Sequence, residues 1–189
     1  VLDTYGKPGS ILAGHPTVKV PGVELNTGAL GHGLSAGIGM ALASRMDKEQ
    51  FRSYVLMGDG ELAEGSVWEA AMAAGHYRLS NLTAIIDRNR LQISGDTETV
   101  MALEDLAARW GAFGWEVAEV DGHDMAALIS ALDTIDHGTQ PRLVIARTVK
   151  GKGVSFIEDN PVWHHKVPTK SQLADALGEL DGRLAEFVS

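Results

Sequence analysis

The sequence predicts an α/β fold: a doubly wound, mostly parallel sheet with helices on both faces. Two observations support this prediction. Short runs rich in Val and Ile alternate with longer stretches of helical spacing, which is the pattern of strand-helix-strand units. Each short run also ends in glycine or polar residues, as strands do where an open parallel sheet forms its ligand crevice. With 189 residues, 44% of them hydrophobic, the chain can bury one core, so residues 1–189 are taken as one domain.

Strands are expected where the apolar runs are short and rich in β-branched residues, at 54–57, 82–86, 115–120 and 143–146. Helices are expected between and after them, at 34–46, 65–77, 102–113, 125–136 and 171–187. The last of these has Ser171 as its expected N-cap and leucines at helical spacing, at Leu173, Leu177, Leu180 and Leu184. The glycine-rich segment 150–153 predicts a long mobile loop before that helix.

Composition excludes several classes of function. The chain has 16 Lys+Arg, 25 Asp+Glu, a net charge of −9 and no basic cluster, which argues against a nucleic-acid surface. No apolar run approaches the ~20 residues of a membrane span, and no secretory leader pattern opens the chain. The absence of cysteine excludes disulfides, zinc thiolates and thiol nucleophiles. We therefore expect a cytoplasmic domain.

Because the chain starts at Val1 and residues 1–19 show no strand, we also expect the N-terminal portion of the domain to be missing.

Two strand ends carry oxygen ligands for a cation. Asp59 lies in Gly-Asp-Gly after the first expected strand, and Asn89 follows the second. Since neighbouring parallel strands end about 5 Å apart, the two side chains can converge. A carboxylate and an amide oxygen suit Mg²⁺ or Ca²⁺, with further positions left for phosphate oxygens. Either motif alone is equally well a plain turn, but the two together favour a metal site that binds a diphosphate, with Gly60 allowing close backbone approach.

These motifs resemble the thiamine diphosphate site of transketolases. The resemblance extends over essentially the whole chain and also rests on Gly14-His15-Pro16, Pro21-Gly22-Val23-Glu24, Thr27-Gly28-Ala29-Leu30-Gly31-His32-Gly33-Leu34-Ser35 and Ala74-Gly75-His76. It implies the diphosphate-binding domain of that family. The implied metal ligands are Asp59, Asn89 and the main-chain carbonyl of Leu91, and Gly60 is implied to contact the diphosphate. Gly28 and Leu30 are implied to lie against the cofactor's aminopyrimidine ring.

The resemblance also assigns histidines. It places His15 at the substrate channel, where its loop position has no evident packing role. His164 and His165 both follow Trp163, and the family pattern points to one or the other as a group that binds the diphosphate and relays protons. His32 replaces the family's common glutamine and receives no role. His76 and His123 are expected to cap or to face solvent.

Acidic residues near the first motif have two interpretations. Glu64 and Glu69 are either solvated charges or, by the resemblance, part of an acidic network across a dimer interface. Glu61, Glu98 and Glu104 are expected on the surface.

The resemblance implies a partner, because the glutamate that activates the cofactor and the arginines that bind sugar phosphates lie on a second, pyrimidine-binding domain in this family. We therefore expect the N-terminal subunit of a split transketolase, joined to a C-terminal subunit in a heterotetramer and transferring a two-carbon ketol unit between sugar phosphates. Two alternatives stay open. Another thiamine diphosphate enzyme, such as a deoxyxylulose-phosphate synthase or a 2-oxo acid dehydrogenase component, would share the Gly-Asp-Gly and Asn motif. A non-catalytic paralogue would be expected to lose Asp59, Asn89 and His15.

Overall fold

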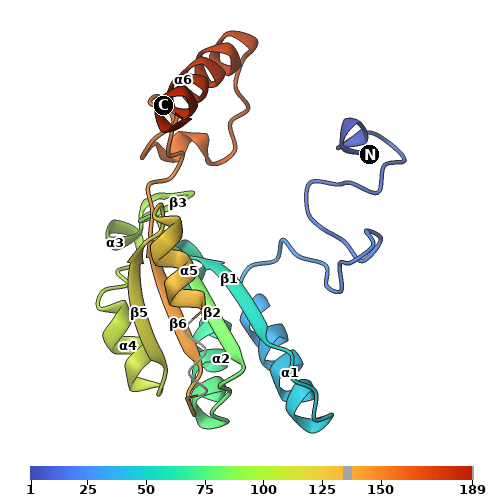
Figure 1. Ribbon diagram of the computed structural model, residues 1–189, viewed down its shortest axis with the longest axis vertical. Helices are drawn as coiled ribbons and strands as arrows, with labels where there is room; N and C mark the ends of the chain where they lie inside the picture. The colour runs from blue at the N-terminus through green and yellow to red at the C-terminus, as the bar shows by residue number, and fades with distance from the viewer. Residues whose placement is uncertain (134–137, 189) are drawn as a thin grey trace.

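A four-stranded parallel sheet forms the centre of the computed structural model, which describes residues 1–133 and 138–188 (Figure 1). The strands are β1 (Ser53–Gly58), β2 (Leu82–Arg88), β5 (Glu116–Asp121) and β6 (Arg142–Arg147). They lie in the order β1-β2-β6-β5, and every neighbouring pair is parallel. All four expected strands are confirmed, as is the α/β class.

Helices cover both faces of this sheet, as expected. Helices α1 (Gly33–Met46), α2 (Gly65–His76) and α4 (Leu106–Ala112) share one face and its core, and α5 (Met125–Asp133) packs on β5 and β6 from the other. The chain runs outward from β2 to β5 and then reverses to insert β6 between them. Because crossovers between parallel strands are right-handed, the helix of the reversed connection lies on the opposite face of the sheet. The expected α5 residues 134–136 lie outside the described part of the chain.

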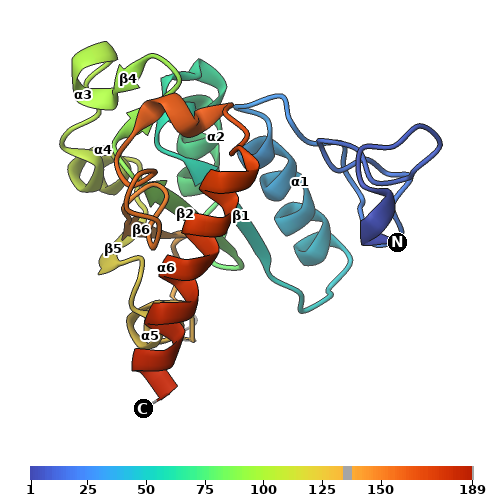
Figure 2. The same ribbon diagram turned by 90° about the horizontal axis from the view of Figure 1, so that it is seen from above.

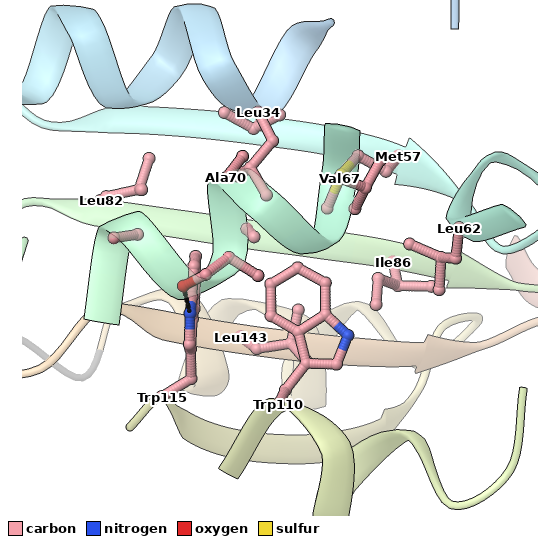
Figure 3. Packing of buried hydrophobic residues seen from close by; sticks show 14 of the residues in the cluster. Leu34, Met57, Leu62, Val67, Ala70, Leu82, Ile86, Trp110, Trp115 and Leu143 are labelled. Carbon is pink, nitrogen blue, oxygen red and sulfur yellow. Dashed lines mark hydrogen bonds between the residues drawn. The ribbon is translucent and has the colours of Figure 1, made fainter. Parts of the chain in front are cut away.

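The main core lies between the sheet and the helices α1, α2 and α4 (Figure 3). Trp110 of α4 is fully buried, and its ring meets Trp115 edge to face with centroids 4.8 Å apart. The indole N–H of Trp115 donates to the carbonyl of Ala71 at 2.8 Å, which joins α2 to the start of β5. Inward side chains of β1 and β2 alternate with outward ones, so the strand pattern in the sequence reports the core directly.

The opposite face of the sheet is covered only in part. Helix α5 covers β5 and β6, where Val144 and Ala146 are buried. Over β1 the outward side chains Tyr54 and Leu56 are 52% and 70% exposed. Within the described residues, this apolar strip has no helix above it.

Two helices begin elsewhere than the sequence suggests. Helix α4 starts at Leu106, not at residue 102, because the Asp105 carboxylate accepts from the amide of Ala108 and caps it there. Helix α6 (Lys170–Val188) is capped by Thr169, not by Ser171. The Thr169 hydroxyl accepts from the amide of Gln172 at 3.3 Å, and the Gln172 side-chain oxygen accepts from the amide of Thr169 at 3.0 Å. This reciprocal pair is a capping box.

Short elements surround the carboxyl ends of the strands. They are the hairpin β3 (Leu91–Gln92) and β4 (Gly95–Asp96), the helix α3 (Thr97–Val100), and the 3₁₀ turns η2 (Gly60–Ala63) and η3 (Pro161–His164). Residues 1–32 form an arm with one 3₁₀ turn, η1 (Leu2–Thr4), that stands away from the sheet (Figure 1). Helix α6 lies beyond the carboxyl ends of the strands, as Figures 1 and 2 both show.

Candidate functional site

Asp59 is the buried centre of the predicted site. It follows β1 directly, its side chain is 1% exposed, and it N-caps η2. Its Oδ1 accepts from the amide of Gly60 at 2.8 Å, while Oδ2 accepts from the amide of Arg90 at 2.6 Å and from Nη1 of Arg88 at 3.0 Å. The end of β2 and the residues after it therefore hold one oxygen of the carboxylate, and the first residue of η2 holds the other.

Asn89 and Leu91 lie on that same loop. The Asn89 side-chain oxygen accepts from the amide of Leu91 at 2.9 Å, and its amide group donates to Asp87 at 3.3 Å. Asp59 is bound by Arg88 and by the amide of Arg90, which are the two chain neighbours of Asn89, so the turn that carries Asn89 and Leu91 lies against Asp59. Gly60 is close as well, because a Cβ on it would lie 2.8 Å from the Cβ of Gln92. Only glycine allows η2 to close on β3 at this distance.

The donor set fits a small hard cation beside a diphosphate. In residues 1–133 and 138–188 no three His, Cys, Asp or Glu side chains group as metal ligands, so such a site would rest on one carboxylate, one amide oxygen and one carbonyl. Mg²⁺ commonly binds through few protein ligands and substrate phosphates. Burial raises the pKa of Asp59, against the hydrogen bonds from Arg90, Arg88 and Gly60 that lower it. A bound cation would relieve that burial cost. Among the described residues Oδ1 accepts one hydrogen bond, so it has a lone pair to offer.

The glycine turn before α1 contacts His15. Gly28 has a φ of +115°, and a Cβ on it would lie 2.7 Å from Cγ of the His15 ring. The imidazole of His15 therefore lies against the bare backbone of Gly28. Leu30, two residues on, is 58% exposed and offers an apolar surface beside it. The arm that holds His15 stands apart from the sheet, so the structure does not bring this histidine to Asp59 (Figure 1).

Glu61 connects the glycine turn to the Gly-Asp-Gly turn. Its Oε1 accepts from the amide of Gly31 at 2.8 Å and its Oε2 from the amide of Gly58 at 3.3 Å. The Ser66 hydroxyl donates to the carbonyl of Gly31 at 2.8 Å and completes the attachment. The expectation that Glu61 is a surface residue is therefore wrong. Its partner is thirty residues away in the chain, so no local pattern reveals the contact.

Arg88 is a functional candidate that sequence reasoning missed. It is the last residue of β2, its side chain is 1% exposed, and it binds Glu98 and Glu104 through Nη2, each at 2.7 Å. Glu98 also accepts from the amides of Leu103 and Glu104. Glu104 is exposed, as expected, whereas Glu98 is half-buried, and both carboxylates neutralise the buried guanidinium of Arg88. Burial acts to raise the pKa of Glu98, but the bonds from Arg88 and the two amides outweigh it, and the pKa is lowered.

His164 and His165 lie at the end of η3, beside the β3 segment that follows Asn89. Their rings meet nearly at right angles with centroids 4.6 Å apart, and both side chains are exposed. Desolvation, then the nearby Lys150 and His165, lower the pKa of His164, which therefore favours the neutral imidazole. Both histidines thus lie on a turn next to β3, and the choice between them stays open.

The remaining predicted residues have simpler surroundings. Glu64 and Glu69 are exposed, and so are His32 and His76. His123 accepts a hydrogen bond from the amide of Val149 at 2.8 Å, so it joins two strand-end loops.

A cavity of about 660 Å³ lies at the opposite end of the sheet, near the amino ends of β1 and β2, and Arg45, Arg52 and Arg78 line it. Arg45 donates to the carbonyls of Tyr77 and Arg78, just past the end of α2. A cation is favoured at a helix C-terminus, so this arginine has a structural explanation. None of the described helices is long and apolar enough to cross a bilayer.

The sequence of this chain matches a known protein family and several of its members. Residues 2–175 match the family described as "Transketolase, thiamine diphosphate binding domain". The chain is 57% identical over 188 residues to one subunit of the apulose-4-phosphate transketolase of Phocaeicola vulgatus, covering 99% of this chain and 67% of that protein. It is 40% identical over 183 residues to a 6-deoxy-6-sulfo-D-fructose transketolase subunit of Clostridium sp., covering 96% of this chain and 66% of that protein.

Solved structures of transketolases have a similar fold. A transketolase from Campylobacter jejuni superposes with a TM-score of 0.79 at 28% identity, covering 98% of this chain and 34% of that one. The chain therefore spans about two thirds of the subunit relatives and about a third of the longer enzyme. It belongs to the transketolase family and carries that family's thiamine diphosphate binding domain.

Proposed function

We propose that this chain is the diphosphate-binding subunit of a two-chain transketolase that moves a two-carbon ketol unit from a ketose phosphate to an aldose phosphate. The observation that carries the proposal is the hydrogen bond from the amide of Arg90, between Asn89 and Leu91, to Asp59, in a domain that matches the family. The relatives from Phocaeicola and Clostridium are transketolase subunits, which favours this reaction over those of other thiamine diphosphate enzymes.

In this proposal Asp59, Asn89 and the carbonyl of Leu91 hold Mg²⁺, or Ca²⁺ in its place, against the diphosphate. Gly60, which has no side chain to collide with Gln92, is the proposed backbone contact to the diphosphate. Thiamine diphosphate, when bound, supplies the electron sink that lets the bond next to the donor carbonyl break and form again. The chain's own share is to bind the metal and the diphosphate, and to support the aminopyrimidine ring on the backbone of Gly28 and the side chain of Leu30.

The histidines supply hydrogen bonds and proton transfer. His15 is held against Gly28, on the turn proposed for the ring, so it reaches the sugar from the cofactor's side. His164 is one of the two candidates for this proton transfer, and its lowered pKa favours the neutral imidazole, the form that can accept a proton. A neutral ring can take a proton from a sugar hydroxyl and return it. His165, at 4.6 Å between ring centroids, is close enough to orient its neighbour.

A second chain is required by this proposal. The relatives from Phocaeicola vulgatus and Actinobacillus succinogenes are each named as one subunit of a transketolase, which supports it. We propose a pyrimidine-domain partner and a heterotetramer with two copies of each chain. Glu64 and Glu69, both exposed on or next to α2, are the proposed contacts across that assembly.

The donor is proposed to be a phosphorylated ketose. The 57% identical relative is named for apulose 4-phosphate, so this sugar is the first to test, against xylulose 5-phosphate as the alternative. Ketol transfer by the two co-purified chains, and none by this chain alone, is the expected result. Turnover by this chain alone would contradict the two-chain proposal.

The metal site is tested by calorimetry on the co-purified subunits. Asp59→Ala with Asn89→Ala should abolish Mg²⁺-dependent binding of thiamine diphosphate. Asp121→Ala is the matched control, because Asp121 is also a carboxylate at the end of a strand, but on the edge strand β5 and away from the site. Wild-type affinity in the double variant would exclude these residues as ligands.

A further inference from the structure

We propose that Arg88 is the positioning residue of the Asp59 metal site, and that Glu98 and Glu104 are the counter-charges that allow a divalent cation to bind beside it. This inference rests on the proposed function, since it takes Asp59 as a metal ligand. It concerns residues that only the structure brings together.

Arg88 occupies a core position. Side chains of β2 alternate between buried and half-buried, and Arg88 shares its buried side with Leu82, Ala84 and Ile86. A charged group at such a position is strongly destabilising unless it is paired. The three inward residues before it are apolar, so packing alone does not call for arginine here.

The guanidinium is held by four oxygens. Nη1 donates to Asp59 Oδ2 at 3.0 Å and to Thr97 Oγ1 at 2.8 Å. Nη2 donates to Glu98 and to Glu104, each at 2.7 Å. Thr97 is itself fully buried. Arg88 therefore has one fixed orientation, and a flexible ammonium group could not reproduce this fork.

This geometry directs the Asp59 carboxylate. Arg88 and the amide of Arg90 both bind Oδ2, so that oxygen already accepts two hydrogen bonds. Within the described part of the chain, Oδ1 accepts from Gly60 alone. The free lone pair is thus on Oδ1, and Asn89 lies between the two residues that hold Oδ2. Arg88 fixes which oxygen of Asp59 is offered to a cation.

Glu98 and Glu104 offset the positive charge that Arg88 places beside the proposed metal ligand. A bare guanidinium beside a metal ligand would repel an incoming cation. Arg88 with Asp59, Glu98 and Glu104 makes one positive charge against three negative ones, a net charge of −2 on the protein side that attracts a divalent cation. Glu104 is 46% exposed, so its charge can be removed without leaving a buried cavity.

The test measures Mn²⁺, as a probe for Mg²⁺, by the electron paramagnetic resonance signal of the free ion. It uses the co-purified two-chain complex with saturating thiamine diphosphate. Arg88→Lys is expected to weaken Mn²⁺ binding by about tenfold or more, as other residues that orient metal ligands do. Glu104→Gln is expected to weaken it by about threefold, with a smaller loss at high salt because the effect is electrostatic. Glu116→Gln, which removes the carboxylate of another Arg-Glu pair at 3.0 Å on β5 and β6, is the matched control and should change nothing.

The outcomes separate this inference from the proposed function. If the wild-type complex does not bind Mn²⁺, or if Asp59→Asn binds it normally, the metal site and this inference both fail. If Asp59→Asn loses binding while folded Arg88→Lys and Glu104→Gln keep the wild-type affinity, only this inference fails. Should Arg88→Lys not fold, Glu104→Gln decides alone, because a purely structural glutamate would change stability and not the affinity of the folded protein.

Discussion

Glu61 Oε1 accepts a hydrogen bond from the backbone amide of Gly31 at 2.8 Å, across thirty residues of sequence. The other oxygen of the same carboxylate accepts from Gly58, the residue before Asp59. One side chain thus fixes the distance between the turn proposed for the aminopyrimidine ring and the turn proposed for the metal.

Glu61→Gln should loosen the glycine turn, because an amide group has one acceptor oxygen for two backbone donors. We expect faster hydrogen exchange at the amides of Gly31 and Gly58, and weaker cofactor binding by the two-chain complex. Glu49→Gln, an exposed glutamate at the far end of the sheet, is the control. Unchanged exchange at Gly31 would show that this bond does not hold the turn.

Two glycines in helices should respond to alanine in opposite directions. A Cβ on Gly75 of α2 would lie 1.8 Å from the carbonyl oxygen of Phe113, so Gly75→Ala must push α2 away from the loop after α4. We expect a loss of about 3 kcal/mol or more in unfolding free energy. Gly39→Ala in α1 meets open space and should gain about 0.5–1 kcal/mol through helix propensity. Urea unfolding followed by circular dichroism measures both, and equal effects would refute the contact.

The imidazole of His164 should titrate below the ordinary value of 6.5, since burial, Lys150 and His165 all lower its pKa. The unfolded chain then binds a proton more readily than the folded one, so stability falls as the pH drops from 6.5 through the lowered pKa. Lys150→Met should raise the pKa measured by NMR, while Lys152→Met should leave it in place. Equal shifts in the two variants would contradict the role of Lys150.

The residue that caps the N-terminus of α6 is Thr169 in the structure and Ser171 in the expectation from the sequence, and two variants distinguish them. Thr169→Ala removes the capping hydroxyl seen in the structure and should destabilise the first turn of α6 by about 1 kcal/mol. Ser171→Ala, at the cap expected from the sequence, should have almost no effect. Hydrogen exchange at the amides of Gln172 and Leu173 reports the first turn. A larger effect of the Ser171 variant would favour Ser171 as the cap.

The sheet could be predicted because each strand alternates or runs apolar over its full length. The start of α4 could not, because residues 102–105 continue the apolar spacing of the expected helix, whereas in the structure the amides of Leu103 and Glu104 bind the side chain of Glu98. Glu98 also binds Arg88, which lies on another element. Local propensity was overridden by a contact between distant residues.

The candidate site, like the fold, could be predicted from the sequence only in part. Asp59 and Asn89 could be predicted because their strand ends are adjacent, a property that follows from topology. The burial of Arg88 could have been predicted from the sequence. It lies two residues after Ile86, and since the side chains of β2 alternate between the two faces, it falls on the inward side of the strand. That pattern was outweighed by the usual exposure of arginine. No sequence pattern predicted the contact of Glu61, because its partner Gly31 lies on a turn without regular structure.

The position of β6 in the sheet bears on how the protein is made. Arg142–Arg147 lies between β2 and β5, although it is the last strand in the chain. While the ribosome is still extending the chain, β2 and β5 have no common neighbour, and both keep unpaired edges. The sheet closes only when the last strand inserts between them, so this domain forms after most of it has been synthesised, through contacts that are distant in sequence and slow to form.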